Sequence, residues 1–277
     1  MTVRVVTDSS NDLPDELIAK YGIDVVPLSI RFGDETFTDR VDLSLDQFWA
    51  RSAASQTLPE TAAPSAGNFQ EVFEQAAANG ADGIVCIMLS GDLSATIQSA
   101  RLAAESVAGT IRVEVVDSRS VSVGLGLVVL AAAEKAATGA DLDAVMATVA
   151  PVVETLEVYA ALDTLDNLKK GGRIGAAQAM LGSLLNFKPV IRVNGEVHEA
   201  GKPRTRIKSL KFVVDKVSAS LPIGRAAVVH GDDPEACERF IELLGDVIDT
   251  SDLLVAKLGP VVGTHGGKGV VGIAFHR

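Results

Sequence analysis

Val3-Arg4-Val5-Val6-Thr7 is a short run rich in β-branched residues, and Asp8-Ser9-Ser10-Asn11-Asp12 follows it directly. The run predicts a buried strand, because β-branched side chains fit a covered, pleated surface. The polar segment ends the strand. Pro14-Asp15-Glu16 is typical of a helix start, with Asp12 as the expected cap. The chain therefore begins with a strand, a polar turn and a helix.

The same alternation continues along the first half of the chain. Further strands are predicted at 25–32, 84–89 and 113–116, and helices at 45–54, 69–78, 95–107 and 121–137. Strands that alternate with helices are joined by right-handed crossovers and lie parallel in one sheet. The first half therefore predicts an α/β domain with a parallel sheet.

The pattern changes after a helix predicted at 142–153. Asn194-Gly195, between apolar runs at 190–193 and Val197, is a strong hairpin signal. The remaining expected elements are a strand at 158–162, a glycine-broken helical region through 185, helices at 210–221 and 235–244, and strands at 226–229, 253–256 and 270–275. The second half therefore predicts an α+β domain with a mixed or antiparallel sheet. We place the domains at 1–158 and 159–277.

Composition narrows the class of function. The chain has 277 residues, 47% of them hydrophobic and 22% charged, which is typical of a globular protein with sizeable cores. Its net charge of -11 disfavours nucleic acid and anionic membrane surfaces, because both attract clustered Lys and Arg. One basic cluster, 202–208, remains available to a partner. Cys86 and Cys237 lie in apolar runs without metal-ligand spacing and are expected to be buried.

No targeting or membrane-spanning pattern is visible in the sequence. The chain enters a strand at once, without the charged and apolar regions of a signal peptide. The longest apolar stretch, 121–137, is too short to span a bilayer and contains charges. We therefore expect a cytoplasmic protein without stable membrane insertion.

Hydroxyl-bearing residues gather where predicted strands end. They follow three strands, in Thr7-Asp8-Ser9-Ser10, in the segment 90–96 and in Asp117-Ser118-Arg119-Ser120, and Thr61 to Ser65 form a further polar loop. Ligands of open parallel sheets bind beyond the carboxyl ends of the strands. A single serine at such a place is more readily explained as a helix cap than as a ligand contact. The convergence of several segments favours a ligand site.

Gly259 to Gly269 is dense in glycine and carries one imidazole, that of His265. Glycines allow a close approach of backbone N–H groups, so such a loop is suited to a small anionic head group. A plain turn before the last strand explains the same residues. The segment lacks the spacing and the Ser or Thr of a P-loop, which makes nucleotide binding a weak hypothesis.

The sequence offers few residues for catalysis. Ser94 and His265 could form an acyl-transfer pair, but the Gly-x-Ser-x-Gly elbow of serine hydrolases is absent around Ser94. No pair of histidines has zinc-ligand spacing, so metal hydrolysis is rejected. We expect a binding protein without metal or cofactor, with a serine-dependent acyl-transfer or hydrolytic enzyme as the alternative.

In order along the chain, these segments resemble the DegV family of bacterial lipid-binding proteins. The matching pieces are Thr7-Asp8-Ser9, Asp12-Leu13, Thr61, Pro64-Ser65, Leu93-Ser94, Thr96, Gln98-Ser99-Ala100, Asp117-Ser118, Leu165, Leu168-Lys169-Lys170-Gly171-Gly172-Arg173-Ile174, Lys188-Pro189-Val190, Lys202, Arg204-Thr205 and Gly259-Pro260-Val261-Val262-Gly263-Thr264-His265. The matches span nearly the whole chain.

The resemblance implies a function and a set of site residues. It implies that one long-chain fatty acid, such as palmitate or oleate, is enclosed between two domains. It also implies that the carboxyl group is presented to a separate ATP-dependent fatty acid kinase. By motif, Thr61 and Ser94 hold the carboxylate and His265, with Thr264 beside it, approaches from the C-terminal domain. Arg173 and Arg204 match basic positions connected with the carboxyl end or with docking to the kinase.

The chain also departs from the family pattern. Ala62-Ala63 and Ala95 stand where the family usually has polar residues or glycine, and Gly266 and Lys268 replace parts of the motif after His265. These changes remove polar groups near the expected head-group pocket and add one cation. The apolar segment Met180 to Phe187 is a candidate tunnel wall for the acyl chain, with plain core packing as the alternative.

Overall fold

The computed structural model describes residues 2–182 and 187–277. The first half is built on a parallel sheet with the strand order β2-β1-β6-β7. Its strands are β1 (Val3–Asp8), β2 (Asp24–Val26), β6 (Gly83–Met88) and β7 (Val113–Asp117). All side chains of β6 are buried, because helices cover both faces of the sheet.

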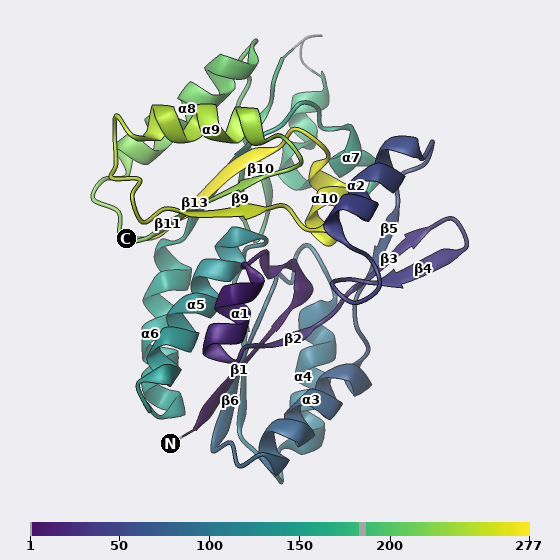
Figure 1. Ribbon diagram of the computed structural model, residues 1–277, viewed down its shortest axis with the longest axis vertical. Coiled ribbons are helices and arrows are strands. Elements are labelled where there is room, and N and C mark those ends of the chain that lie inside the picture. The colour runs from purple at the N-terminus through teal and green to yellow at the C-terminus, as the bar shows by residue number, and fades with distance from the viewer. Residues whose placement is uncertain (1, 183–186) are drawn as a thin grey trace.

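Two groups of helices sandwich this sheet (Figure 1). One face packs against α1 (Asp15–Tyr21), α5 (Val123–Ala137) and α6 (Leu142–Thr155). The other packs against α3 (Ala66–Ala78) and α4 (Thr96–Val107), with Phe69 and Phe73 at the centre of that core. The predicted α/β first half is therefore confirmed.

The second half contains a six-stranded mixed sheet with the order β10-β9-β8-β13-β11-β12. Only β11 and β12 pair in parallel. The strands are β8 (Glu157–Ala161), β9 (Val190–Asn194), β10 (Glu196–Gly201), β11 (Ala226–His230), β12 (Leu254–Lys257) and β13 (Val271–Phe275). The predicted hairpin is present, with Gly195 at φ +76° between β9 and β10. The predicted α+β second half is confirmed.

Helices α8 (Arg206–Ala219) and α9 (Pro234–Leu244) cover one face of this sheet. The opposite face turns toward the first half, where Val158, Ile191 and Val193 share a core with Val123 and Leu127 of α5. The proposed domain boundary between residues 158 and 159 stays a prediction. Strand β8 crosses it and belongs to the six-stranded sheet.

A small antiparallel sheet with the order β4-β3-β5 stands beside the first half and corrects one prediction. It contains β3 (Ser29–Phe32), β4 (Glu35–Thr38) and β5 (Glu60–Ala62), and α2 (Leu45–Ala54) follows β4. The single strand predicted at 25–32 is wrong. Pro27 lies between β2 and β3 and has no N–H for a ladder, and the two strands join different sheets.

The segment Gly259 to Gly269 corrects a second prediction. Pro260–Gly266 is a helix, α10, and only the residues after it form the glycine turn that leads to β13. Pro260 occupies the first turn of the helix, where its missing N–H costs nothing. Gly263 lets the helix pack closely on α2: a Cβ there would lie 2.8 Å from Phe48 and 3.1 Å from Trp49.

The remaining elements are short. They are the 3₁₀-helices η1 (Ser9–Asn11) and η2 (Gly175–Gly182) and the helix α7 (Asp166–Lys170). Asp12 does not cap α1, which corrects a third prediction. Pro14 precedes the helix, and the Asp12 carboxylate accepts hydrogen bonds from Ser122 and Gly259 instead. Part of the candidate tunnel wall, 183–186, lies outside the described residues.

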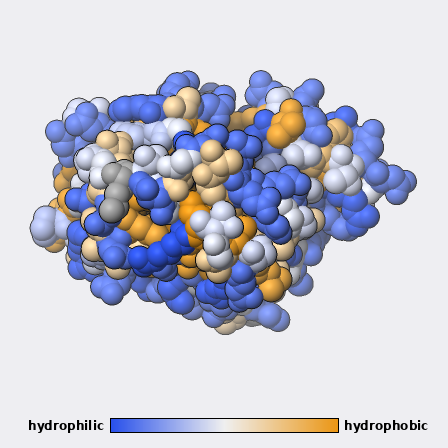
Figure 2. Space-filling model, turned by 90° about the horizontal axis from the view of Figure 1, so that it is seen from below, coloured by the Kyte–Doolittle hydropathy of each residue, from blue (hydrophilic) through white to orange (hydrophobic). Residues whose placement is uncertain are grey.

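The outer surface is mostly polar. Seen from below the first half, hydrophilic residues dominate and hydrophobic ones appear in patches between them (Figure 2). No helix in the described part of the chain has the length and apolar character needed to cross a membrane. Cys86 and Cys237 are both free and buried, as predicted.

Candidate functional site

A cavity of about 230 Å³ lies where the two sheets face each other. Its walls are largely aliphatic and come from both halves of the chain. Among them are Leu28, Leu89 and Val123 from the first half and Val158, Ile191 and Val261 from the second. Five residues with polar side chains other than tyrosine also line it, namely Thr61, Ser94, Ser122, Arg173 and His265. The cavity suits an amphipathic ligand.

The cavity brings together two residues that lie 204 positions apart. Thr61 is carried by β5 and His265 by the last turn of α10, and their side chains hydrogen-bond at 3.1 Å between Oγ1 and Nε2. β5 is held against β3, where Thr61 lies opposite Ile30. The small sheet thus brings a hydroxyl to the imidazole across the cavity mouth.

His265 is a neutral imidazole in this setting. Burial, together with the positive charge of Arg173, lowers its pKa to about 4. Its Nδ1 is buried without a hydrogen-bond partner in the described residues, and Gly171 lies directly against it. An N–H at Nδ1 would lack an acceptor, so the hydrogen bonding assigns the proton to Nε2. Nε2–H then donates to Thr61 Oγ1, which leaves the Thr61 hydroxyl proton for a ligand.

Arg173 is a half-buried cation beside this pair. Its Nε donates to the carbonyl of Leu93 at 3.2 Å and its Nη1 to that of Gly171 at 2.8 Å. No carboxylate of the described residues forms an ion pair with it. A half-buried cation without a carboxylate partner among these residues favours an anionic ligand.

Ser94 stands next to the carbonyl that Arg173 binds. Its Oγ lies 2.9 Å from Thr96 Oγ1 and accepts the backbone N–H of Thr96 at 3.3 Å. Ser94 and Thr96 therefore organise the start of α4. Among the described residues, Ser94 has no hydrogen bond to His265. The Nε2 of His265 is hydrogen-bonded to Thr61 instead. Ser94 and His265 therefore line the same cavity, but His265 is not placed to act as a general base for Ser94.

Two predicted site residues lie elsewhere. Arg204 is exposed on the turn before α8 and is not part of the cavity wall. Thr264 is buried, and its hydroxyl donates to the Pro260 carbonyl one helical turn earlier at 2.9 Å. The structure therefore brings Thr61, Ser94, Arg173 and His265 together and leaves Arg204 and Thr264 outside.

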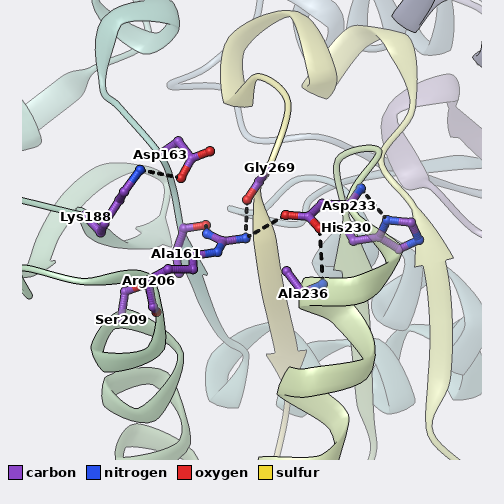
Figure 3. A network of polar contacts seen from close by, with 9 residues as sticks. All are labelled: Ala161, Asp163, Lys188, Arg206, Ser209, His230, Asp233, Ala236 and Gly269. Carbon is purple, nitrogen blue, oxygen red and sulfur yellow. Dashed lines mark hydrogen bonds and ion pairs between the residues drawn. The ribbon is translucent and has the colours of Figure 1, made fainter.

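The glycine turn after α10 is tied into the second half instead of wrapping the cavity. Arg206 donates to the Gly269 carbonyl and lies 3.6 Å from the Asp233 carboxylate, and Lys188 pairs with Asp163 nearby at 2.8 Å (Figure 3). Gly269 also donates its N–H to Gly231. Lys268 pairs with Asp232 at 2.7 Å, so the cation that departs from the family pattern points away from the head-group end.

Two further positions at the cavity are not among the predicted site residues. Ser122 lines the cavity just before α5, and the hydroxyl-rich run after β7 was the available signal. Gly171 makes room for the imidazole, because a Cβ there would lie 2.3 Å from His265 Nδ1. The double glycine before Arg173 was the only hint in the sequence. In the described part of the chain, no group of three or more His, Cys, Asp or Glu residues could hold a metal ion.

The family model described as "Uncharacterised protein, DegV family" matches residues 2–277. A DegV domain-containing protein of Deinococcus radiodurans is 36% identical, over 99% of this chain and 98% of its own.

Two solved structures share the fold closely. One is a DegV family protein from Thermus thermophilus, described as binding fatty acid. It has a TM-score of 0.92 and 35% identity, and the match covers 100% of this chain and 99% of that one. The other is a stearic acid-binding protein of Eubacterium ventriosum, with a TM-score of 0.91, 26% identity and coverage of 99% and 98%.

Proposed function

This chain belongs to the DegV family, and from that premise we propose that it binds one long-chain fatty acid in the cavity between its two sheets. The carboxyl group would lie at Thr61, Ser94, Arg173 and His265, and the acyl chain along the aliphatic walls. The observation that carries this proposal is the guanidinium of Arg173, which has no carboxylate partner in the described part of the chain, beside a neutral Thr61–His265 pair at a largely apolar cavity.

The chemistry of a carboxylate matches these groups. A carboxylate accepts hydrogen bonds and donates none, and the Thr61 hydroxyl and the Arg173 guanidinium are donors. Charge-assisted bonds of this kind are stronger than neutral ones. The neutral state of His265 supports a role in orienting Thr61 through Nε2–H, so that the threonine proton points to the ligand.

The acyl chain would supply most of the affinity. Each buried methylene is worth about 0.8 kcal/mol, so a saturated chain of some fourteen methylenes gains roughly 10 kcal/mol before the cost of association. The related proteins of T. thermophilus and E. ventriosum, described as binding fatty acid and stearic acid, support the same ligand class here.

A binding role without catalysis fits the side chains better than acyl transfer. Ser94 is hydrogen-bonded to Thr96 and His265 to Thr61, so this serine and this histidine are not in the arrangement that activates a nucleophile. A fluorophosphonate probe tests this alternative. Labelling of Ser94 would favour an enzyme, and we expect none.

The finer proposal is that the carboxyl group is presented to a separate ATP-dependent fatty acid kinase. The exposed position of Arg204, next to Lys202 and Lys208, supports docking to such a partner over contact with the carboxylate. Loaded protein mixed with the purified kinase and ATP should yield acyl phosphate. Arg204→Ala should slow that step and leave the lipid bound. We also propose a cytoplasmic location, which cell fractionation tests.

The central experiment is native mass spectrometry of the purified protein. We expect a co-purifying fatty acid, and labelled palmitate or oleate should exchange with it. Thr61→Ala and Ser94→Ala should each weaken retention, because each removes a hydroxyl from the head-group end. An empty protein that never takes up either lipid would refute the proposal.

A further inference from the structure

Asp12 occupies a position that the cavity itself does not explain. It follows η1 in the left-handed region at φ 49°, and its side chain is almost fully buried, with 4% of the residue exposed. Its Oδ2 accepts the Ser122 hydroxyl at 2.5 Å, and its Oδ1 accepts the backbone N–H of Gly259 at 3.0 Å. One carboxyl group thus bonds two segments that are far from it in sequence.

One partner lines the cavity, and the other directly precedes a helix that lines it. Ser122 lines the cavity and directly precedes α5. Gly259 precedes α10, the helix that carries the lining residues Val261, Val262 and His265. A Cβ at residue 259 would lie 2.5 Å from the Asp12 carboxylate, so only glycine allows this approach. The Asp12 side chain therefore fastens α10 to the first half, behind the head-group end.

The ionised form of the Asp12 carboxyl group is disfavoured by burial. Burial raises the pKa of Asp12 to about 7; the bonds from Ser122 and Gly259 and the charge of Arg40 oppose the rise, and Asp39 adds to it. The charged groups that surround Asp12 come from several elements: Asp8 of β1, Asp39 and Arg40 after β4, Asp15 and Glu16 of α1, and Lys257 of β12. Asp12 is thus a buried acid between two lobes.

We propose that Asp12 is a proton-dependent clasp that holds α10 against the first half and so controls the rate at which the bound lipid leaves. The regulation of lipid release rests on the proposed fatty acid function. Opening of the clasp would separate Gly259 from Asp12 and move the helix that bears His265. The bond to Ser122 keeps the carboxyl oriented toward Gly259 while the clasp is closed.

The direction of the pH effect follows from the two states. Once opened to water, the Asp12 carboxyl returns toward an ordinary aspartate pKa of about 3.9, far below its pKa of about 7 in the closed form. The closed form therefore binds the proton more tightly. The free-energy preference for the closed form over the open form is largest at low pH. It declines as pH rises from about 4 to about 7 and is constant above that range. Lipid release should accelerate as pH rises.

The test measures release of a fluorescent fatty acid into excess phosphatidylcholine vesicles from pH 6 to pH 8. For a pKa of about 7, the wild-type rate should rise about tenfold across this interval. Asp12→Asn should remove this rise, because its side chain does not titrate. Asp34→Asn removes the same charge from an exposed turn and should follow the wild type. Titration of the lipid itself is common to all variants.

Ser122→Ala gives a second, independent reading. The Ser122 hydroxyl stabilises the charged form of Asp12, so loss of this hydroxyl should move the midpoint of the rate increase to higher pH than in the wild type. A residue with a purely structural role would change the rate without moving the midpoint. If Asp12→Asn keeps the wild-type pH dependence, or Ser122→Ala leaves the midpoint in place, the clasp is refuted.

Amide hydrogen exchange of lipid-free protein separates this proposal from the proposed function. At pH 8, residues 261–266 should exchange more slowly in Asp12→Asn than in Asp34→Asn, because the neutral amide stands in for the protonated carboxyl group that favours the closed form. If no fatty acid is ever retained by the wild type, the proposed function fails, and this exchange difference alone decides whether the fastening exists. Equal exchange in both variants, with lipid retained, refutes the clasp and leaves the fatty acid function intact.

Discussion

Gly171→Ala should disturb the head-group end without straining the backbone. Gly171 ends α7 with φ -79° and ψ -3°, a conformation that alanine adopts freely. The added Cβ would lie 2.3 Å from His265 Nδ1 and 2.8 Å from Cε1, whereas such contacts are ordinarily 3.4 Å or longer. The ring must therefore move by 3.4 − 2.3, or about 1.1 Å.

The far side of the imidazole ring has no space for this movement. Nε2 already lies 3.1 Å from Thr61 Oγ1, so a shift of about 1 Å toward Thr61 would bring the atoms closer than any hydrogen bond. The ring must rotate away, and the threonine hydroxyl loses its orientation. Overpacking of this kind costs about 1–3 kcal/mol, which corresponds to roughly 5- to 150-fold weaker lipid binding if the cost falls on the bound state.

The assay is displacement of labelled palmitate, with Gly109→Ala as the matched control because a Cβ there meets nothing within 4 Å. A double-mutant cycle with His265→Ala shows whether the effect passes through the ring. Once the imidazole is gone, Gly171→Ala should cost little. If Gly171→Ala binds palmitate as tightly as Gly109→Ala, the reasoning about the imidazole is wrong.

Three further predictions concern charge and stability. Arg173→Met should weaken palmitate binding by about 1.5–3 kcal/mol, roughly ten- to hundredfold, in a displacement assay, whereas Arg204→Ala should leave it unchanged, because only Arg173 lines the cavity. The folded-state pKa of His265 lies below its unfolded value, so its contribution to stability is complete above pH 6.5 and is lost as pH falls toward 4. Urea unfolding at pH 7 and pH 4.5 should show that loss, at most about 3 kcal/mol, as the difference between the wild type and His265→Asn, because the opposite effect of the buried carboxyl groups is common to both. Ser44→Ala breaks the capping box that Ser44 forms with Gln47 at the start of α2 and should lower the free energy of urea unfolding by about 1 kcal/mol; an unchanged midpoint would contradict the assignment.

The sequence predicted the elements whose signal is local. The strands β1, β6 and β7 are short apolar runs with helices between them, and helix α2 was predicted with its observed bounds, Leu45–Ala54. The hairpin at Asn194-Gly195 was equally clear, since positive φ at Gly195 is a local property. Such features depend on neighbouring residues and need no knowledge of the fold.

What the sequence could not supply was long-range pairing. The separation of β2 from β3 depends on which sheet each strand joins, and the helix α10 depends on burial of Gly263 against Phe48 and Trp49. The same holds at the site. Motifs identified Thr61 and His265, but only the fold brings Thr61 Oγ1 within 3.1 Å of His265 Nε2. Only the fold, likewise, places the Asp12 carboxylate in hydrogen-bond contact with Ser122 and Gly259. Thr264, in the same motif as His265, and Arg204, in a separate motif, lie outside the cavity for that reason.

The two cysteines give each half of the molecule its own built-in reporter. Cys86 lies in β6, wholly inaccessible, and Cys237 lies in α9, with 3% exposed. Burial raises the pKa of both thiols, that of Cys237 to about 11, so neither reacts while its surroundings are intact. Alkylation rates followed separately at the two sulfurs would therefore record how often each half opens on its own, in the unaltered protein and with lipid present or absent.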